Sequence, residues 1–186
     1  MEISLTNFLT SIIKLSEEEI SLLSKKLLNK QLKKGDTILN KGDVCSSVYF
    51  IICGSLYEYY LDNDFNINVI DLYCNQDWVL NHKSFVSRKP SQYSIEAFED
   101  SQVYELTIEG IHELIGVSQS FLKLGKILNK ANNRLDFFDK NKSADEKYKY
   151  VLNNKPMLLQ KFPLGMIASY LKISPETLSR VRNRIN

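Results

Sequence analysis

The residues best suited to chemistry lie near the C-terminus, where polar and cationic side chains share one face of a predicted helix. They are Glu176, Thr177, Ser179, Arg180, Arg182 and Arg184. Arginine can donate two hydrogen bonds to guanine, and glutamate can accept one from the amino group of cytosine. Such a face is typical of a helix that enters the major groove of DNA. An ordinary solvated basic face is the alternative interpretation.

Two short helices joined by a tight turn must position these side chains. Ser174 is a predicted N-cap, Pro175 stands at the first helical position, and Glu176 places an acid in the first turn. Apolar residues at helical spacing supply the inner faces of both helices: Ile167, Ala168, Leu171, Ile173, Leu178 and Val181. The pattern predicts a helix-turn-helix.

The charge distribution agrees with a polyanionic partner. The 186-residue chain carries a formal net charge of only +2. Residues 159–186 hold Lys161, Lys172 and the three arginines against one acid, Glu176, a net charge of +4 that leaves −2 for the rest. Positive charge therefore collects where DNA would bind. A single domain with this few cations would bind DNA weakly. We therefore expect dimerisation to double the site.

Other classes of function lack a signal in the sequence. No apolar run reaches the length of a membrane span, and the N-terminus lacks a signal-peptide pattern. Cys45, Cys53 and Cys74 show no Cys-x-x-Cys spacing, which favours reduced thiols in a cytoplasmic protein. His82 and His112 are too far apart in sequence to suggest a metal site. Without a Ser/His/acid set or a phosphate-cradling glycine loop, we expect neither an enzyme nor a cofactor.

The first two thirds of the chain read as a helix followed by many short strands. Ser16–Glu19 is a capping box, followed at helical spacing by Ile20, Leu23, Leu27 and Leu28. Runs rich in β-branched and aromatic residues then predict strands at Thr37–Leu39, Val48–Ile52, Ser55–Leu61, Ile67–Tyr73, Tyr93–Ala97 and Ser101–Leu106. Strands at this spacing, separated by Gly and Asp turns, indicate an antiparallel barrel or jelly roll.

A helical period returns over about 117–140. Apolar residues alternate there at spacings of three and four: Phe121, Leu124, Leu128, Ala131, Leu135 and Phe138. A stripe this narrow favours a seam between two copies of the chain, so we expect a homodimer. Packing of the helix on its own barrel is the alternative. Residues 140–142 are a predicted hinge, and a second capping box at Ser143–Glu146 opens the next helix, so we place domain boundaries at 1–141 and 142–186.

Three motifs in this order resemble the catabolite-activator (Crp/Fnr) family of bacterial transcription regulators. They are Lys34–Asp43, Val48–Gly54 and Ile167–Arg180. The resemblance implies an α+β fold with a cyclic-nucleotide-binding-like β-roll (a jelly roll), a long dimerisation helix and a C-terminal, winged-helix-like helix-turn-helix domain. It also implies that Glu176 and Arg180 read bases. An i,i+4 ion pair between the two is the other interpretation, and it is compatible with base reading because each side chain can orient the other.

The ligand cassette departs from the family pattern. Leu80-Asn81 stands where cyclic-nucleotide sensors carry Gly-Glu, and Ser91-Gln92 stands where they carry Arg and a small residue. A buried phosphate without an arginine partner is costly, so we expect no gating by cyclic nucleotide. The remaining candidates for a ligand pocket are Trp78, Arg88, Lys89, Gln92 and Tyr93. The family's N-terminal cysteine cluster is absent from the first forty residues.

The resemblance therefore implies a homodimeric, sequence-specific DNA-binding transcription regulator that recognises a palindromic operator in double-stranded DNA. RNA polymerase is the further partner that it implies. The alternative is a small-molecule sensor or protein-interaction module built on the same roll. Two departures bear on the DNA-binding segment: Pro175 occupies a position where some relatives carry a base-reading Arg, and Lys172 stands in the turn where Gly is usual.

Overall fold

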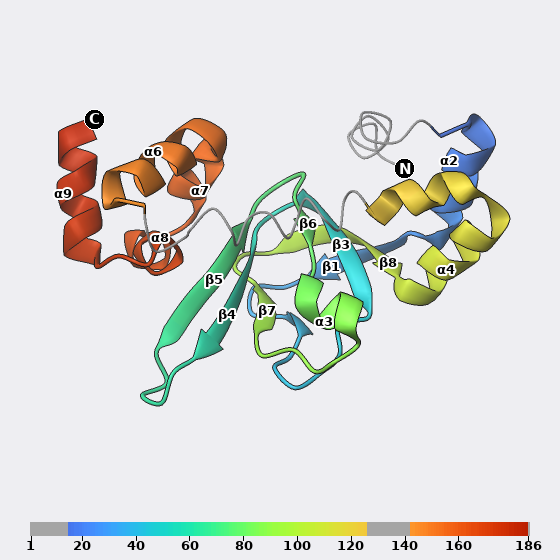
Figure 1. The fold of residues 1–186 in the computed structure, drawn as a ribbon, viewed down its shortest axis with the longest axis horizontal. Helices are drawn as coiled ribbons and strands as arrows, with labels where there is room; N and C mark the ends of the chain where they lie inside the picture. The colour runs from blue at the N-terminus through green and yellow to red at the C-terminus, as the bar shows by residue number, and fades with distance from the viewer. Residues whose placement is uncertain (1–14, 126–141, 186) are drawn as a thin grey trace.

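The structure, a computed structural model, describes residues 15–125 and 142–185 (Figure 1). In chain order its elements are α2 (Glu17–Lys26), β1 (Leu28–Leu32), β2 (Thr37–Leu39), β3 (Ser47–Cys53), β4 (Leu56–Leu61), β5 (Ile67–Tyr73), β6 (Trp78–Val79), α3 (His82–Ser87), β7 (Ser94–Ala97), β8 (Ser101–Thr107), α4 (Ile108–Val117), the 3-10 helix η1 (Gln119–Leu124), α6 (Ala144–Asn154), α7 (Pro156–Lys161), α8 (Leu164–Leu171) and α9 (Pro175–Ile185). No helix within these ranges is both long and apolar enough to cross a membrane.

The strands form two four-stranded antiparallel sheets, in the orders β1-β8-β3-β6 and β2-β7-β4-β5. Side chains from both sheets fill a shared core with α2, α4 and η1, in which Phe50, Ile51, Leu56 and Val103 are fully buried. The predicted β-roll is therefore confirmed. Runs rich in β-branched and aromatic residues, bounded by turn residues, were enough to locate β2, β3, β4, β5, β7 and β8 to within a residue or so.

The structure corrects the prediction at the end of the first helix. Helix α2 stops at Lys26, and Leu28 begins strand β1 instead of continuing the helical stripe. Residues 28–32 pair with β8 from Leu28↔Glu105 to Leu32↔Ser101. Strands β1 and β6 carry little apolar alternation of their own, so pairing with distant strands decides their conformation.

The segment after α4 also differs from the predicted continuous helix. Ser118 has an extended backbone, with φ −146° and ψ 131°, and separates α4 from η1. Phe121 and Leu124 lie in η1 and are 0% and 5% exposed against the chain's own core, so these two are not on an exposed face. The other four stripe residues, Leu128, Ala131, Leu135 and Phe138, lie outside the described residues.

Helices α6 to α9 share a second core with the outer face of the roll. Tyr148, Val151, Leu171 and Leu178 are buried in it, together with Leu72 of β5. Figure 1 shows these helices at one end of the roll, with α2 and α4 at the other. Residues 142–185 contain no strand, so the winged-helix likeness is limited here to the helices. The domain boundary at 141/142 remains a prediction.

Candidate nucleic-acid interface

The turn between α8 and α9 has a defined hydrogen-bonded geometry. The N–H of Lys172 donates to the carbonyl of Ser169 and the N–H of Ile173 to that of Ala168, both at 3.0 Å. This pair of bonds is a Schellman motif, in which the residue after the helix adopts a left-handed backbone. Lys172 has φ 56° and ψ 48°, so it takes the conformation that glycine adopts most easily.

Helix α9 begins as predicted. The hydroxyl oxygen of Ser174 accepts from the N–H of Thr177 at 3.2 Å, and Pro175 is the first helical residue. The inner residues Ala168, Leu178 and Val181 are 1%, 0% and 2% exposed. Burial of these residues fixes the rotation of α9 and turns its polar face outward.

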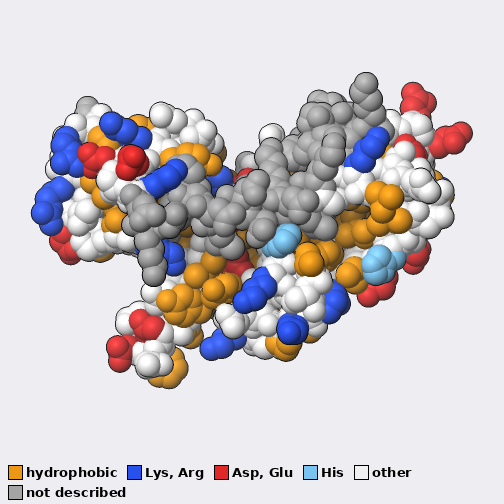
Figure 2. Space-filling model, in the orientation of Figure 1, with side chains coloured by type: hydrophobic (Ala, Val, Ile, Leu, Met, Phe, Trp, Pro, Cys, Tyr) orange, Lys and Arg blue, Asp and Glu red, His pale blue; other side chains and the backbone are white. Residues whose placement is uncertain are grey.

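The outer face of α9 carries most of the predicted DNA-binding side chains. Glu176, Ser179, Arg180 and Arg184 are exposed, while Thr177 and Arg182 are half-buried. Lys172 is exposed at the turn that precedes the helix. Figure 2 shows Lys and Arg side chains gathered on the outside of the C-terminal helices. The structure therefore brings the predicted residues to one helix with a cationic outer surface.

Glu176 and Arg180 do not form the ion pair that their spacing allowed. The Nε of Arg180 donates instead to the backbone carbonyl of Glu176, at 3.4 Å. A hydrogen bond with Ser174 and the charge of Arg180 hold the pKa of the Glu176 carboxyl below its usual value, so it is an ionised acceptor at neutral pH. Both side chains therefore keep the chemistry that base recognition needs.

Two of the other predicted residues also have roles inside the domain. Arg184 forms an ion pair with Asp145 in the first turn of α6. The hydroxyl of Thr177 lies 3.1 Å from that of Ser174 and belongs to the cap of α9. Their contribution to a nucleic-acid interface therefore competes with contacts that hold the helices together.

The sequence analysis missed Lys147, which supports the helix-turn-helix from beneath. Lys147 is 7% exposed, and its ammonium donates to the carbonyl of Leu171 at 3.1 Å. That carbonyl belongs to the last turn of α8, where backbone acceptors lack helical partners and the helix dipole is negative. Lysine side chains usually lie in solvent, so the sequence gives no signal for this capping role, and only the tertiary contact reveals it.

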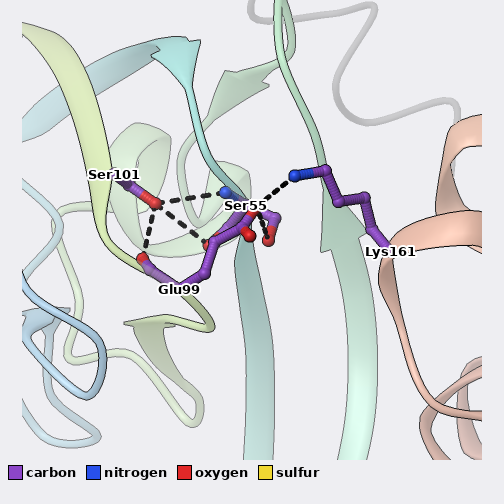
Figure 3. A network of polar contacts seen from close by, with 4 residues as sticks. All are labelled: Ser55, Glu99, Ser101 and Lys161. Atoms are coloured by element: carbon purple, nitrogen blue, oxygen red, sulfur yellow. Dashed lines mark hydrogen bonds and ion pairs between the residues drawn. The ribbon is translucent and has the colours of Figure 1, made fainter.

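The helices are tied to the roll by a polar network (Figure 3). The ammonium of Lys161, at the end of α7, lies 2.7 Å from Oε1 of Glu99, which also accepts from the hydroxyl of Ser55 at 3.0 Å. Ser101 accepts from the N–H of Ser55 at 3.1 Å and donates to the carbonyl of Glu99 at 2.8 Å. A side chain at Gly54, which has φ 103°, would meet the Ser101 hydroxyl at 2.1 Å, so this close approach requires glycine.

A second contact between the helices and the roll lies at the edge of the β2-β7-β4-β5 sheet. Strand β5 is the last strand of its sheet, and the N–H of Val69 donates to the hydroxyl of Ser169 on α8 at 2.9 Å. The rings of Phe98 and Phe162 pack beside these contacts with centroids 4.8 Å apart. The helix-turn-helix thus docks on the roll through one of its own two helices, α8, and leaves α9 outward.

Asn81 of the departing ligand cassette lies in a cluster of buried polar side chains. The amide of Asn81 donates to Oε1 of Glu58 at 2.5 Å, and its oxygen caps α3 by accepting from the N–H of Ser84 at 2.8 Å. The hydroxyl of Tyr73 donates to the other oxygen of Glu58 at 3.2 Å. Glu58 and Asn81 are 4% and 7% exposed, so this is an internal polar cluster.

Burial gives Glu58 an unusual acidity. Removal from water, with a smaller contribution from the charge of Asp71, outweighs the lowering effect of the hydrogen bonds from Asn81 and Tyr73 and raises the pKa of its carboxyl to about 7. A carboxyl that is partly ionised at neutral pH would repel the phosphate of a cyclic nucleotide.

The other candidate pocket residues are dispersed. Trp78 is 7% exposed and packs against Phe50, with ring centroids 5.2 Å apart. Arg88 ends α3 in a left-handed conformation and donates to the carbonyl of Cys45 at 2.7 Å. The ring of Tyr93 lies against Tyr60, with centroids 6.1 Å apart. Lys89 and Gln92 are exposed.

Comparison with protein families identifies the class of the roll. Residues 29–117, from β1 to the end of α4, match the family model of the cyclic nucleotide-binding domain. Over these residues the roll is therefore similar to the cyclic nucleotide-binding domain. No curated protein matches the chain in sequence.

Solved structures extend the similarity to the helices. The catabolite activator protein of Thermus thermophilus is 19% identical with a TM-score of 0.57, over 92% of this chain and 84% of that one. FixK2 of Bradyrhizobium japonicum is 15% identical with a TM-score of 0.64, over 86% and 84%. A regulator from Eubacterium rectale, assigned to the Crp/Fnr family, is 17% identical with a TM-score of 0.57, over 91% and 83%. The chain therefore has the Crp/Fnr fold, as the sequence motifs predicted.

Proposed function

We propose that the protein is a sequence-specific DNA-binding transcription regulator. The observation that carries the proposal is the geometry of α9, whose apolar side is buried and whose outer side presents Glu176 and Arg180. A helix of this kind fits the major groove, where glutamate and arginine distinguish base pairs by their hydrogen-bonding edges. The similarity of fold to a catabolite activator protein supports the same function. Action on DNA implies a cytoplasmic location, and contact with RNA polymerase stays a prediction.

We further propose that the regulator acts as a homodimer on a palindromic operator. A two-fold pair would place two recognition helices about 34 Å apart, one turn of DNA. The apolar stripe from Leu128 to Phe138 is the part of the predicted interface that supports this proposal. Phe121 and Leu124 are already buried in the chain's own core and add no exposed surface to it.

Regulation by cyclic nucleotide is not part of the proposal. Asn81 already bonds to Glu58 and to the N–H of Ser84 where the family pattern has its ribose-binding Glu. The hydroxyl of Ser91, where the family pattern has its phosphate-binding Arg, donates to the carbonyl of Tyr93 at 2.7 Å. A cyclic nucleotide would have to break these buried bonds and enter beside the Glu58 carboxyl, which is costly.

Fluorescence polarisation with a palindromic DNA, selected from a random pool by the protein itself, tests the function. Arg180→Ala should weaken binding to the selected DNA by about 1–3 kcal/mol and relax its sequence preference. Arg182→Ala, the matched loss of a charge on the same helix, should weaken all sequences alike. Equal losses on every sequence for both variants would remove Arg180 from the base-reading role, and absence of any selected DNA would refute the function.

A further inference from the structure

A cavity of about 510 Å³ lies between the roll and α8. Buried Tyr57, Val69 and Ala97 belong to its inner wall, whereas exposed Lys34 and Gly165 belong to its rim. The rest of its lining is Gly35, Ile67, Glu96, Phe98, Met166 and Ser169. The volume falls within the range of about 300–1,000 Å³ that small-molecule sites occupy. Domain interfaces are also where such sites are common.

The walls of the cavity are suited to a flat apolar body. The rings of Tyr57 and Phe98 meet edge to face, with centroids 6.4 Å apart and planes at 87°. Met166 of α8 lines the same space and has an unbranched side chain that adapts to the shape of its neighbours. Aromatic rings and a methionine together favour an aromatic or similarly planar guest.

Both oxygens of the Glu96 carboxylate in the cavity wall already accept hydrogen bonds from the protein. One oxygen of Glu96 accepts from the hydroxyl of Tyr57 at 2.7 Å, and the other accepts from that of Tyr59 at 3.0 Å. Burial and the hydrogen bond to Glu96 raise the pKa of both tyrosine hydroxyls, so both stay protonated as donors. The Glu96 carboxylate is therefore held against Tyr57 and Tyr59 in the cavity wall, away from Lys34 at the rim.

The positive charge lacks such a partner. The ammonium of Lys34 lies 5.9 Å from the centroid of the Phe98 ring. Within residues 15–125 and 142–185, no carboxylate lies within ion-pair distance of this ammonium. An anion at the rim would neutralise Lys34 while its apolar part covered the aromatic wall.

We propose that this cavity binds a small organic monoanion with a flat apolar body, such as an aromatic carboxylate. The anionic group pairs with Lys34, and the body lies among Tyr57, Phe98 and Met166. The guest contacts the roll and α8 at once, so it binds the docked arrangement and stabilises it. Its effect on DNA binding rests on the proposed function, whereas its binding to the cavity does not.

Calorimetric titration of the full chain with 1-naphthoate tests the site. We expect one molecule to bind per chain, and Lys34→Gln to weaken binding at least tenfold. The neutral amide of the same ring system, 1-naphthamide, should bind at least tenfold more weakly than the acid. No binding of 1-naphthoate, or equal binding of acid and amide, would overturn the proposal.

A pair of variants at Gly165 shows whether the guest occupies this cavity. A Cβ at Gly165 would meet nothing within 4 Å, and the residue is helical, so substitution leaves the fold intact. Gly165→Leu should fill the cavity and abolish binding, while Gly165→Ala should retain it. Undiminished binding to the Gly165→Leu variant would place the guest elsewhere. DNA binding measured without 1-naphthoate reports separately on the proposed function.

Discussion

Lys172 occupies a left-handed position at the turn before α9, with φ 56°. A non-glycine residue pays about 1 kcal/mol there because its Cβ crowds the carbonyl. Lys172→Gly should therefore raise the free energy of unfolding by about 1 kcal/mol, measured by urea denaturation. Because Lys172 is exposed, the same change should slightly lower the affinity for DNA of every sequence by removing a cation.

Lys172→Asn separates the two effects. Asparagine tolerates the left-handed conformation better than lysine but carries no charge. The Lys172→Asn variant should lose as much DNA affinity as the Lys172→Gly variant. Its free energy of unfolding should rise by less than that of the glycine variant. A glycine variant no more stable than the wild type would show that the Schellman motif carries no strain.

Glu58 makes stability depend on pH in a direction unusual for a carboxyl. Burial raises the pKa of Glu58 in the folded protein to about 7, above the ordinary value of 4.5. The folded chain therefore holds this proton more tightly than the unfolded chain. Its contribution to stability is fully present below pH 4.5 and is lost as the pH rises to 7.

Glu58→Gln should remove that loss. Thermal and urea denaturation between pH 5 and pH 8 should show a flatter profile, with the variant gaining up to about 3 kcal/mol at pH 8. Glu105→Gln is the control, because the pKa of Glu105 lies below its ordinary value. Burial raises that pKa, but the hydrogen bonds from Lys30, Ser47 and Tyr49 outweigh the effect of burial. Its loss should destabilise the protein at neutral pH. An unchanged pH profile for Glu58→Gln would contradict the raised pKa.

At the scale of elements, α8 and strand β5 depend on each other. The edge strand leaves the N–H of Val69 without a strand partner on that side, and the hydroxyl of Ser169 accepts from it at 2.9 Å. Ser169→Ala should cost about 1 kcal/mol of stability and speed hydrogen exchange at the Val69 amide. Ser179→Ala, on the exposed face of α9, should change neither. Unaltered exchange at Val69 would mean that this bond does not secure the docking.

Helix ends illustrate what could be predicted at this scale. The capping boxes at Ser16 and Ser143 form both of their reciprocal hydrogen bonds, as their sequences predicted. The break at Ser118 was missed: its hydroxyl accepts locally from the N–H of Ser120 at 3.2 Å as the N-cap of η1, and it also donates to distant Glu19 at 2.6 Å. A periodic stripe through Phe121 and Leu124 cannot reveal that contact.

For the whole molecule, the proposed dimer is the central prediction. Leu135→Glu places a charge within the predicted stripe and should convert a dimer into a monomer in sedimentation equilibrium. Binding to the palindromic DNA should fall at least tenfold, because the two half-sites are no longer linked. Asn132→Glu, off the stripe, should stay dimeric. A wild-type chain that sediments as a monomer would contradict the paired-operator proposal.

The sequence by itself determined the features that depend on neighbouring residues. Capping pairs, short runs of β-branched and aromatic residues and the apolar side of α9 are each visible within a few residues of sequence, so the roll and the helix-turn-helix could be predicted. The outward side of α9 was predictable for the same reason: burial of Leu178 and Val181 turns the opposite side, with Arg180, to the exterior.

Only the tertiary structure decided which distant residues meet. Glu58 and Asn81 join across 23 positions of sequence, Lys147 reaches Leu171 across 24, and Ser169 reaches Val69 across 100. The first contact places Asn81 of the cassette in a buried polar cluster, and the third holds α8 against β5 beside the cavity. The free energy of such contacts depends on geometry and burial, which no local pattern of residues records.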